Sequence, residues 1–265
     1  MESAFWYNLA LSFLVGGAWV TLVTLTADRF GSKVGGLLGG FPATILVALL
    51  FIGITQTPSA ASDATSVVPV AQGLNGFFII AYVLLIRRGL AWGLAGSLLV
   101  WLVLAGTLVA VGVRPFWASV AGWLVLLAVC YTIVSKLLNI DSTGRQVIQY
   151  TFRRVAWRAA LGGGVIAFAV LMGKVGGPTV GGVFATFPAM FISTLIITHQ
   201  SGGAAVSRAV AKALMLSGMI NVTLYAIAVR YLYVSLGLSL GTVLALAFSC
   251  CTVYLTNALI LNRIP

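Results

Sequence analysis

Residues 34–43 read Val-Gly-Gly-Leu-Leu-Gly-Gly-Phe-Pro-Ala, and residues 180–189 read Val-Gly-Gly-Val-Phe-Ala-Thr-Phe-Pro-Ala. The two stretches lie 146 residues apart and share a glycine-containing run followed by Phe-Pro-Ala. The same offset aligns Gly16-Gly17 with Gly162-Gly163, and Asn75 with Asn221. Three matches at one offset, in consecutive apolar segments, predict that the chain contains an internal repeat.

The composition around these blocks is that of a membrane protein. Of 265 residues, 61% are hydrophobic and 7% are charged, whereas a soluble domain carries roughly a quarter charged residues. The long apolar stretches therefore predict helices that cross a lipid bilayer. The net charge of +11 would indicate nucleic-acid binding in a soluble protein. Here we expect the cations to face anionic headgroups, and we do not expect nucleic acid as a partner.

A helix needs about 20 mostly apolar residues to cross the hydrocarbon core. This rule predicts an all-α, polytopic transmembrane helix bundle of about nine helices. The break at Val113-Arg114-Pro115 separates two of them, because a single helix over 89–137 would be roughly 70 Å long against a core of ~30 Å. The predicted spans are 5–27, 34–55, 66–86, 89–112, 116–137, 155–173, 178–198, 210–229 and 239–261. The first is a full-length span without a basic leader, so we do not expect it to be a cleaved signal peptide.

The cationic residues give an independent test of this count. With nine spans, one side of the membrane receives only Arg114, Lys174 and Arg230 of the 15 cations. The basic side is cytoplasmic in a plasma or inner membrane, so the N-terminus is predicted outside and the C-terminus inside. The other side receives Arg29, Lys33, Arg87, Arg88, Lys136, Arg145, Arg153, Arg154, Arg158, Arg208, Lys212 and Arg263.

The position of the fifth span sets the orientation of the repeats. Residues 1–112 form the first predicted four-helix repeat and 151–265 the second, while 113–150 hold a linking helix and a basic cytoplasmic loop. Because one extra crossing separates the repeats, they are predicted to be inverted relative to one another. Inverted repeats are common in secondary transporters, whose binding sites lie at the repeat interface near the midplane.

The order of elements in each half resembles the GlpM-like inner-membrane proteins. The similar segments are Lys33-Val-Gly-Gly-Leu-Leu-Gly-Gly-Phe-Pro-Ala-Thr44 and Val180 to Ala189, each a glycine-containing span carrying Phe-Pro. The resemblance implies two fused GlpM-like units, the second inverted, and multi-pass membrane residence. It carries over no catalytic residue and no substrate.

The Phe-Pro blocks are the first candidate binding elements. Small residues spaced four apart, such as Gly35 with Gly39 and Gly181 with Ala185, let helix backbones approach closely. Pro42 and Pro188 cannot donate to the preceding turn, so each is predicted to kink its helix and to free a carbonyl, that of Leu38 or of Phe184. Freed backbone groups at broken helices bind substrates and ions in transporters. Packed, kinked helices without a site are the alternative.

Amides inside the predicted spans are the second candidates. Gln72 and Asn75 share one helix face, as do Ser217 and Asn221, and they should point away from lipid. They either line a pathway or bond helix to helix. The predicted substrate-binding set is Gly39, Gly40, Phe41, Pro42, Thr44, Gln72, Asn75, Thr186, Phe187, Pro188, Ser217 and Asn221.

Other chemistry finds little support in the sequence. Cys130, Cys250 and Cys251 match no metal-binding spacing and read as packing residues. One His and four scattered acids predict no catalytic constellation, no metal site and no cofactor. We therefore expect a non-enzymatic transporter or permease for a small neutral, amphipathic or weakly charged solute.

An ion channel and a membrane scaffold or assembly protein are the alternative functions. The expected partners are the bilayer, anionic lipid on the cytoplasmic face, and a substrate or ion that the sequence does not identify, with homo-oligomerisation left open. The polar outer connection from Thr55 to Ser66 is predicted to be solvated and mobile.

Overall fold

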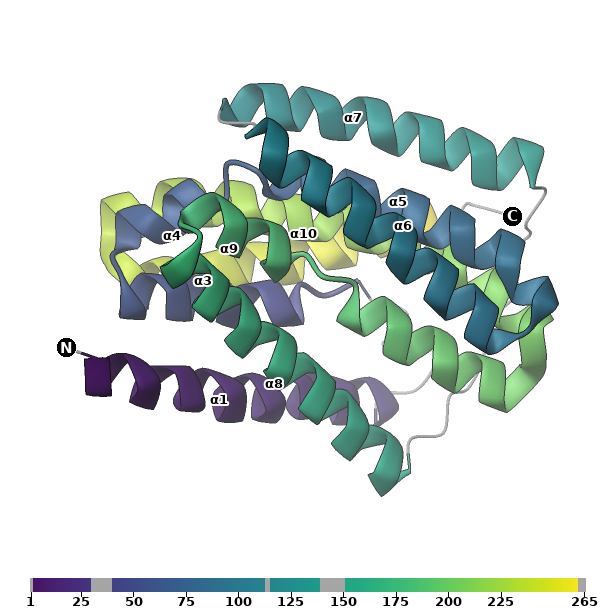
Figure 1. Cartoon of the computed structure of the whole chain (residues 1–265), viewed down its shortest axis with the longest axis horizontal. Coiled ribbons are helices and arrows are strands. Elements are labelled where there is room, and N and C mark those ends of the chain that lie inside the picture. Colours follow the sequence, from purple (N-terminus) through teal and green to yellow (C-terminus); the bar gives the residue numbers. More distant parts are fainter. Residues whose placement is uncertain (1, 30–39, 113–114, 139–150, 262–265) are drawn as a thin grey trace.

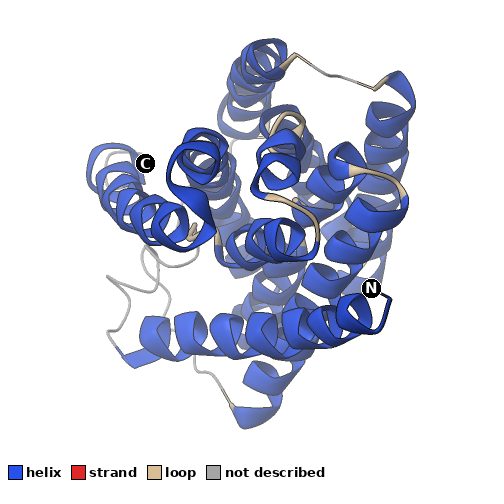
Figure 2. Cartoon of the chain, turned by 90° about the vertical axis from the view of Figure 1, so that its left-hand side faces the viewer, coloured by secondary structure: helices blue, strands red, loops and turns tan. Residues whose placement is uncertain are grey.

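The computed structural model describes residues 2–29, 40–112, 115–138 and 151–261, and the regular structure in these ranges is entirely helical (Figure 2). The prediction of an all-α chain is confirmed for these residues. In chain order the elements are α1 (Glu2–Arg29), α3 (Ala43–Thr55), α4 (Pro58–Ala64), α5 (Val68–Leu85), η1 (Ile86–Arg88), α6 (Leu90–Val111), α7 (Phe116–Thr132), η2 (Ile133–Leu137), α8 (Phe152–Val175), α9 (Pro178–Ala185), α10 (Ala189–Thr256) and η3 (Asn257–Leu261).

Six helical segments of the described chain are long and apolar enough to cross a membrane. One of them, Pro178–Leu259, covers 82 residues and holds three of the predicted spans. Within α10 the backbone leaves helical geometry at Gly203 (φ 74°, ψ −170°) and at Gly237 (φ 75°, ψ 177°), between those spans. Glycine suits these points because a side chain strains a backbone with positive φ. The count of nine spans stays a prediction.

The outer surfaces of the bundle are apolar. On α6 and α7 the exposed side chains include Trp92, Leu99, Leu102, Val103, Trp117, Leu124 and Val125. A soluble monomer rarely exposes a continuous apolar face of this kind. The helices are therefore compatible with a multi-pass protein whose outer faces contact lipid.

Helices α1 and α8 cross closely at their glycines (Figure 1). A Cβ on Gly16 would lie 2.5 Å from Ile166, and a Cβ on Gly162 would lie 2.8 Å from Val20. The repeat offset of 146 relates the two contacts. Gly162 is the equivalent of Gly16, and Val20 is the equivalent of Ile166. The crossing therefore has the form that a two-fold axis between the helices would produce.

A second pair of contacts at this crossing obeys the same relation. A Cβ on Gly17 would lie 3.2 Å from the carbonyl oxygen of Ala159, and one on Gly163 would lie 2.5 Å from that of Phe13. Gly163 also faces the backbone nitrogen of Gly17, its own equivalent, at 3.3 Å. Such close backbone approach is what small residues permit between membrane helices.

The prediction of a solvated connection between Thr55 and Ser66 was wrong. Residues 58–64 form α4, whose Ala61 and Ala64 are fully buried and which packs against α3, α9 and α10. Arg230 of α10 donates to the carbonyl of Ser62 (3.2 Å) and to Oγ of Ser66 (2.9 Å). The small side chains of this segment serve close packing, which composition alone does not distinguish from exposure.

The α1–α8 crossing predicts opposite effects for two neighbouring glycines. Gly163→Ala brings its Cβ against the Phe13 carbonyl and should cost about 1–3 kcal/mol of stability. Gly164→Ala meets nothing within 4 Å and should be neutral or stabilising by up to about 1 kcal/mol. Thermal unfolding in detergent micelles measures both changes. Equal shifts in Tm for the two variants would contradict the crossing.

Candidate functional site

The two Phe-Pro-Ala blocks adopt the same local backbone. Helix α3 begins at Ala43 after Pro42 (φ −76°, ψ 52°), and α10 begins at Ala189 after Pro188 (φ −76°, ψ 40°). The N–H of Ala43 donates to the carbonyl of Phe41 at 2.7 Å, and the N–H of Ala189 donates to that of Phe187 at 2.8 Å. Both helices thus start from the same tight turn, at equivalent positions in the two halves.

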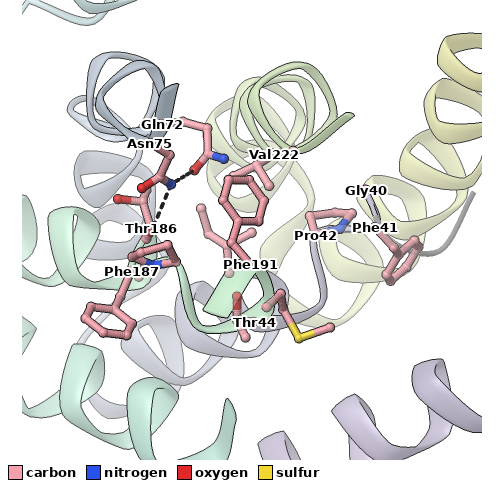
Figure 3. A pocket seen from close by; sticks show the side chains of 15 residues that line it. Gly40, Phe41, Pro42, Thr44, Gln72, Asn75, Thr186, Phe187, Phe191 and Val222 are labelled. Atoms are coloured by element: carbon pink, nitrogen blue, oxygen red, sulfur yellow. Dashed lines mark hydrogen bonds between the residues drawn. The ribbon is translucent and has the colours of Figure 1, made fainter. Parts of the chain in front are cut away.

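These two helix starts line one cavity of about 40 Å³ (Figure 3). One water molecule needs roughly 10–15 Å³ by this measure, so the cavity has room for a few. The described lining residues are Gly40, Phe41, Pro42, Thr44, Ile45, Gln72, Asn75, Ala185, Thr186, Phe187, Pro188, Met190, Phe191, Gly218 and Val222.

Most of the lining falls into pairs separated by 146 residues. The six pairs are Gly40 with Thr186, Phe41 with Phe187, Pro42 with Pro188, Thr44 with Met190, Ile45 with Phe191, and Gln72 with Gly218. In the last pair the two members face each other, since a Cβ on Gly218 would lie 3.5 Å from Nε2 of Gln72. The cavity is therefore lined by residues that the sequence predicts to be equivalent; the repeat itself stays a prediction.

Asn75 supplies the hydrogen bonds inside the cavity. Its Nδ2 donates to Oε1 of Gln72 and to the carbonyl oxygen of Thr186, both at 2.9 Å (Figure 3). The side chain is only 2% exposed, and its Oδ1 has no partner among the described atoms. An unpaired buried acceptor is costly, so a water or ligand in the cavity that donates to Oδ1 would stabilise this arrangement.

The helix break before Pro188 differs in one respect from the sequence prediction. The sequence predicts that Pro188 frees the carbonyl of Phe184, but that oxygen accepts from the N–H of Phe187 at 3.1 Å. The carbonyl of Val183 accepts from both the N–H (3.1 Å) and Oγ1 (2.7 Å) of Thr186. A tight final turn thus satisfies the carbonyls that the proline leaves. The corresponding carbonyl of Leu38 lies outside the described residues.

Several N–H groups at the two helix starts, in contrast to these carbonyls, have no described hydrogen-bond partner. The first helical bonds run from Leu46 to Pro42 and from Ile192 to Pro188. The N–H groups of the two residues before each of these, in the first turn, have no described backbone acceptor. These N–H groups belong to cavity-lining residues, as do the carbonyls of Gly40 and Ala185, which have no described donor, so the lining residues carry unpaired backbone groups of both kinds.

Aromatic rings enclose the cavity. Phe187 meets Trp101 of α6 edge to face, with ring centroids 5.0 Å apart. Phe41 lies 6.3 Å from Trp19 of α1, and Phe191 lies 6.5 Å from Phe78 of α5. These contacts fix both Phe-Pro turns against helices from elsewhere in the bundle.

Ser217 and Asn221 lie behind Gly40 and are not among the described lining residues. A Cβ on Gly40 would collide with Oγ of Ser217 and would lie 3.1 Å from Nδ2 of Asn221. Asn221 is 1% exposed, its Oδ1 accepts from Thr256 at 3.0 Å, and its Nδ2 has no described partner. Of the other predicted site residues, Gly39 lies outside the described residues and the rest line the cavity. Their role in binding stays a prediction.

Sequence reasoning did not single out a buried cation beside the cavity. Arg158 of α8 is 4% exposed. Its Nη1 donates to Oγ1 of Thr194 at 3.0 Å, and its Nη2 lies 3.6 Å from Sδ of Met190, a lining residue. The sequence analysis counted Arg158 only among the cations predicted on the cytoplasmic side. In the described part of the chain no group of three or more His, Cys, Asp or Glu side chains is placed to hold a metal.

Comparison with known proteins gives one match. A profile of the family described as "Protein of unknown function (DUF3147)" matches residues 9–136, just under half of the chain, which run from α1 through α7. This similarity differs from the GlpM-like resemblance, which stays a prediction. No curated protein and no solved structure matches the chain.

The contact between Gly40 and Ser217 can be tested by a double-mutant cycle. Gly40→Ala should cost about 1–3 kcal/mol because its Cβ overlaps Ser217. In a Ser217→Gly background the same change should cost much less, since the overlapping atoms are gone. Thermal unfolding in micelles measures the four proteins, with Gly106→Ala, which meets nothing within 4 Å, as the control. Additive effects would show that the two residues do not touch.

Proposed function

We propose that the chain is a multi-pass membrane transporter for a small solute, with its substrate site in the cavity between the two Phe-Pro turns. The observation that carries this proposal is the pairing of the cavity lining at one offset. In transporters built from inverted repeats, the site lies at the interface of the repeats, at broken helices.

The α1–α8 contacts support the inversion of the repeats. Each glycine contact recurs with the roles of the two helices exchanged. Exchange of this kind is the mark of a two-fold relation between the halves. In our proposal the axis lies in the membrane plane, nine spans complete the topology, and the N-terminus is outside a plasma or inner membrane.

One difference between the halves supports alternating exposure of the site. Asn75 donates to the carbonyl of Thr186 in the second Phe-Pro turn. The equivalent bond would run from Asn221 to the carbonyl of Gly40 in the first turn. The Nδ2 of Asn221 lies beside Gly40 but has no described partner. In our proposal the bond of Asn221 forms, and that of Asn75 breaks, when the two halves exchange conformations.

The remaining predictions made from the sequence are also part of the proposal. The protein is not an enzyme, needs no cofactor, and rests its basic loops on anionic lipid at the cytoplasmic face. The GlpM-like resemblance of both halves is part of the proposal. An anion-conducting channel is the second candidate function, because four N–H groups at the two helix starts have no described backbone acceptor. Conduction far above the turnover of a carrier would favour it.

The topology is tested by reporters that are active on one side of the membrane. A tag before residue 5 should report from outside, and tags in 139–150 and after Leu261 should report from the cytoplasm. Even numbers of crossings would place both ends on one side. If both ends report from the same face, the inversion and the proposed site interface are wrong.

Alternating exposure is tested by labelling two equivalent lining positions. Thr44→Cys and Met190→Cys, each with Cys130→Ala, Cys250→Ser and Cys251→Ser, should react with an impermeant maleimide added on either side of proteoliposomes. Asn75→Ala should shift the ratio of outside to inside labelling in one direction and Asn221→Ala in the other. An interhelical bond of about 0.6–1.7 kcal/mol gives roughly a three- to eighteenfold shift.

A matched control is available on the helix that carries Asn221. Thr223→Val is isosteric, and Thr223 is buried with no described hydrogen bond, so the labelling ratio should not change. Labelling from one side only, in the parent and in both Asn variants, would exclude alternating exposure. Shifts of both Asn variants in the same direction would exclude the exchange of the two bonds.

A further inference from the structure

The two helix starts present unpaired donors to one cavity. Thr44 and Ile45 of α3, and Met190 and Phe191 of α10, all line it. Their N–H groups have no described backbone acceptor, and they lie at the positive ends of their helices. Backbone donors at a helix start bind negatively charged groups, and two such starts at one small cavity combine their effect.

Part of the opposing helix end is already hydrogen-bonded. The cavity also contains the C-terminal end of α9, whose carbonyls would favour a cation. Those of Val183 and Phe184 accept from Thr186 and Phe187, and that of Thr186 accepts from Asn75. Three acceptors are therefore engaged, while the carbonyls of Ala185 and Gly40 have no described donor and the four N–H groups have no described backbone acceptor.

Charged side chains reinforce this polarity. Among the described lining residues none is acidic. The guanidinium of Arg158, 4% exposed, touches Met190 of the lining. Among the described residues, the lining therefore has no charged side chain that would oppose a negative occupant.

Asn75 is an independent sign that the cavity is made to be occupied. It is buried and lines the cavity, yet its Oδ1 has no described partner. An anion alone cannot satisfy this acceptor, but a water in the anion's shell can donate to it. The volume of about 40 Å³ has room for a small ion with such a water.

We propose that the cavity between the starts of α3 and α10 binds a small monovalent anion, partly hydrated, as the transported species. This inference rests on the proposed function, because it names the substrate class of the same site. The donors are the N–H groups of Thr44, Ile45, Met190 and Phe191. Asn75 holds the accompanying water.

Protection from labelling tests the proposal. In proteoliposomes of the Met190→Cys protein, chloride, nitrate or formate replaces gluconate at constant ionic strength, and the rate of maleimide reaction with the introduced thiol is followed. The small anions should slow labelling at least fivefold in a saturable way. Urea and glycerol, which are of similar size and neutral, should not slow it.

Two variants of Thr44, at the start of α3, separate the effect of a negative charge from the effect of side-chain size. Thr44→Asp places a fixed carboxylate at the first turn of α3 and should raise the anion concentration for half protection at least tenfold. Thr44→Asn has the same size without the charge and should raise it much less. The labelling rate of the introduced thiol without anion shows whether each variant keeps its fold, and the ligand series on the parent protein needs neither variant.

The outcomes separate this inference from the proposed function. Labelling from both sides with protection by urea or glycerol, or with no dependence on small anions, overturns the anion site and leaves alternating exposure standing. Labelling from one side only overturns the proposed function. Protection by sodium or potassium at fixed anion concentration would reverse the assigned polarity and overturn the inference.

Discussion

Backbone groups without a hydrogen-bond partner cannot face lipid, and this constraint governs the whole arrangement. An interrupted helix is tolerated at membrane depth only where protein or a lined cavity receives its free ends. A helix starts at Ala43, and another starts at Ala189 after the break that follows α9, and both starts line the same cavity. Tight final turns satisfy carbonyls on one side of the second break. The breaks, the burial of α4 and the aromatic enclosure all serve to keep these ends away from hydrocarbon.

Glycine makes the required close approach possible. At the α1–α8 crossing the backbones of Gly17 and Gly163 nearly touch, and Gly181 of α9 lies against Gly173 of α8 in the same way. A side chain at any of these positions would separate the helices and open the protein around the breaks. The glycines therefore determine the position of the Phe-Pro turns, although most of them do not line the cavity. The helix pairing that packs the bundle therefore also brings together the residues of the proposed site.

The sequence predicted the helical class, the interruption at Pro188 and most of the lining, because these depend on local composition and on one repeated offset. It could not predict that α4 is buried, since Ala and Ser suit both close packing and solvent. The carbonyl of Phe184 accepts a hydrogen bond from Phe187 because α9 ends in a tight turn, which no sequence pattern predicts. The burial of Arg158 against Met190 arises from how α8 and α10 cross, which is long-range information. Ser217 and Asn221 were placed on the right helix face, but the side of Gly40 they contact depends on helix rotation.

The two predicted repeats differ at several residues in and near the cavity. Gln72 corresponds to Gly218, so only one half places an amide on the axis of the cavity. Thr256, which holds Asn221, corresponds to Ala110, so the two asparagines have different second partners. Two identical halves would give two conformations of equal energy, whatever the solute. In the alternation that we propose, different partners for Asn75 and Asn221 remove that equality, because each conformation satisfies a different set of buried amides. A solute that supplies the missing donor or acceptor in one of them can then shift the balance, and the divergence between the halves provides the means for it to do so.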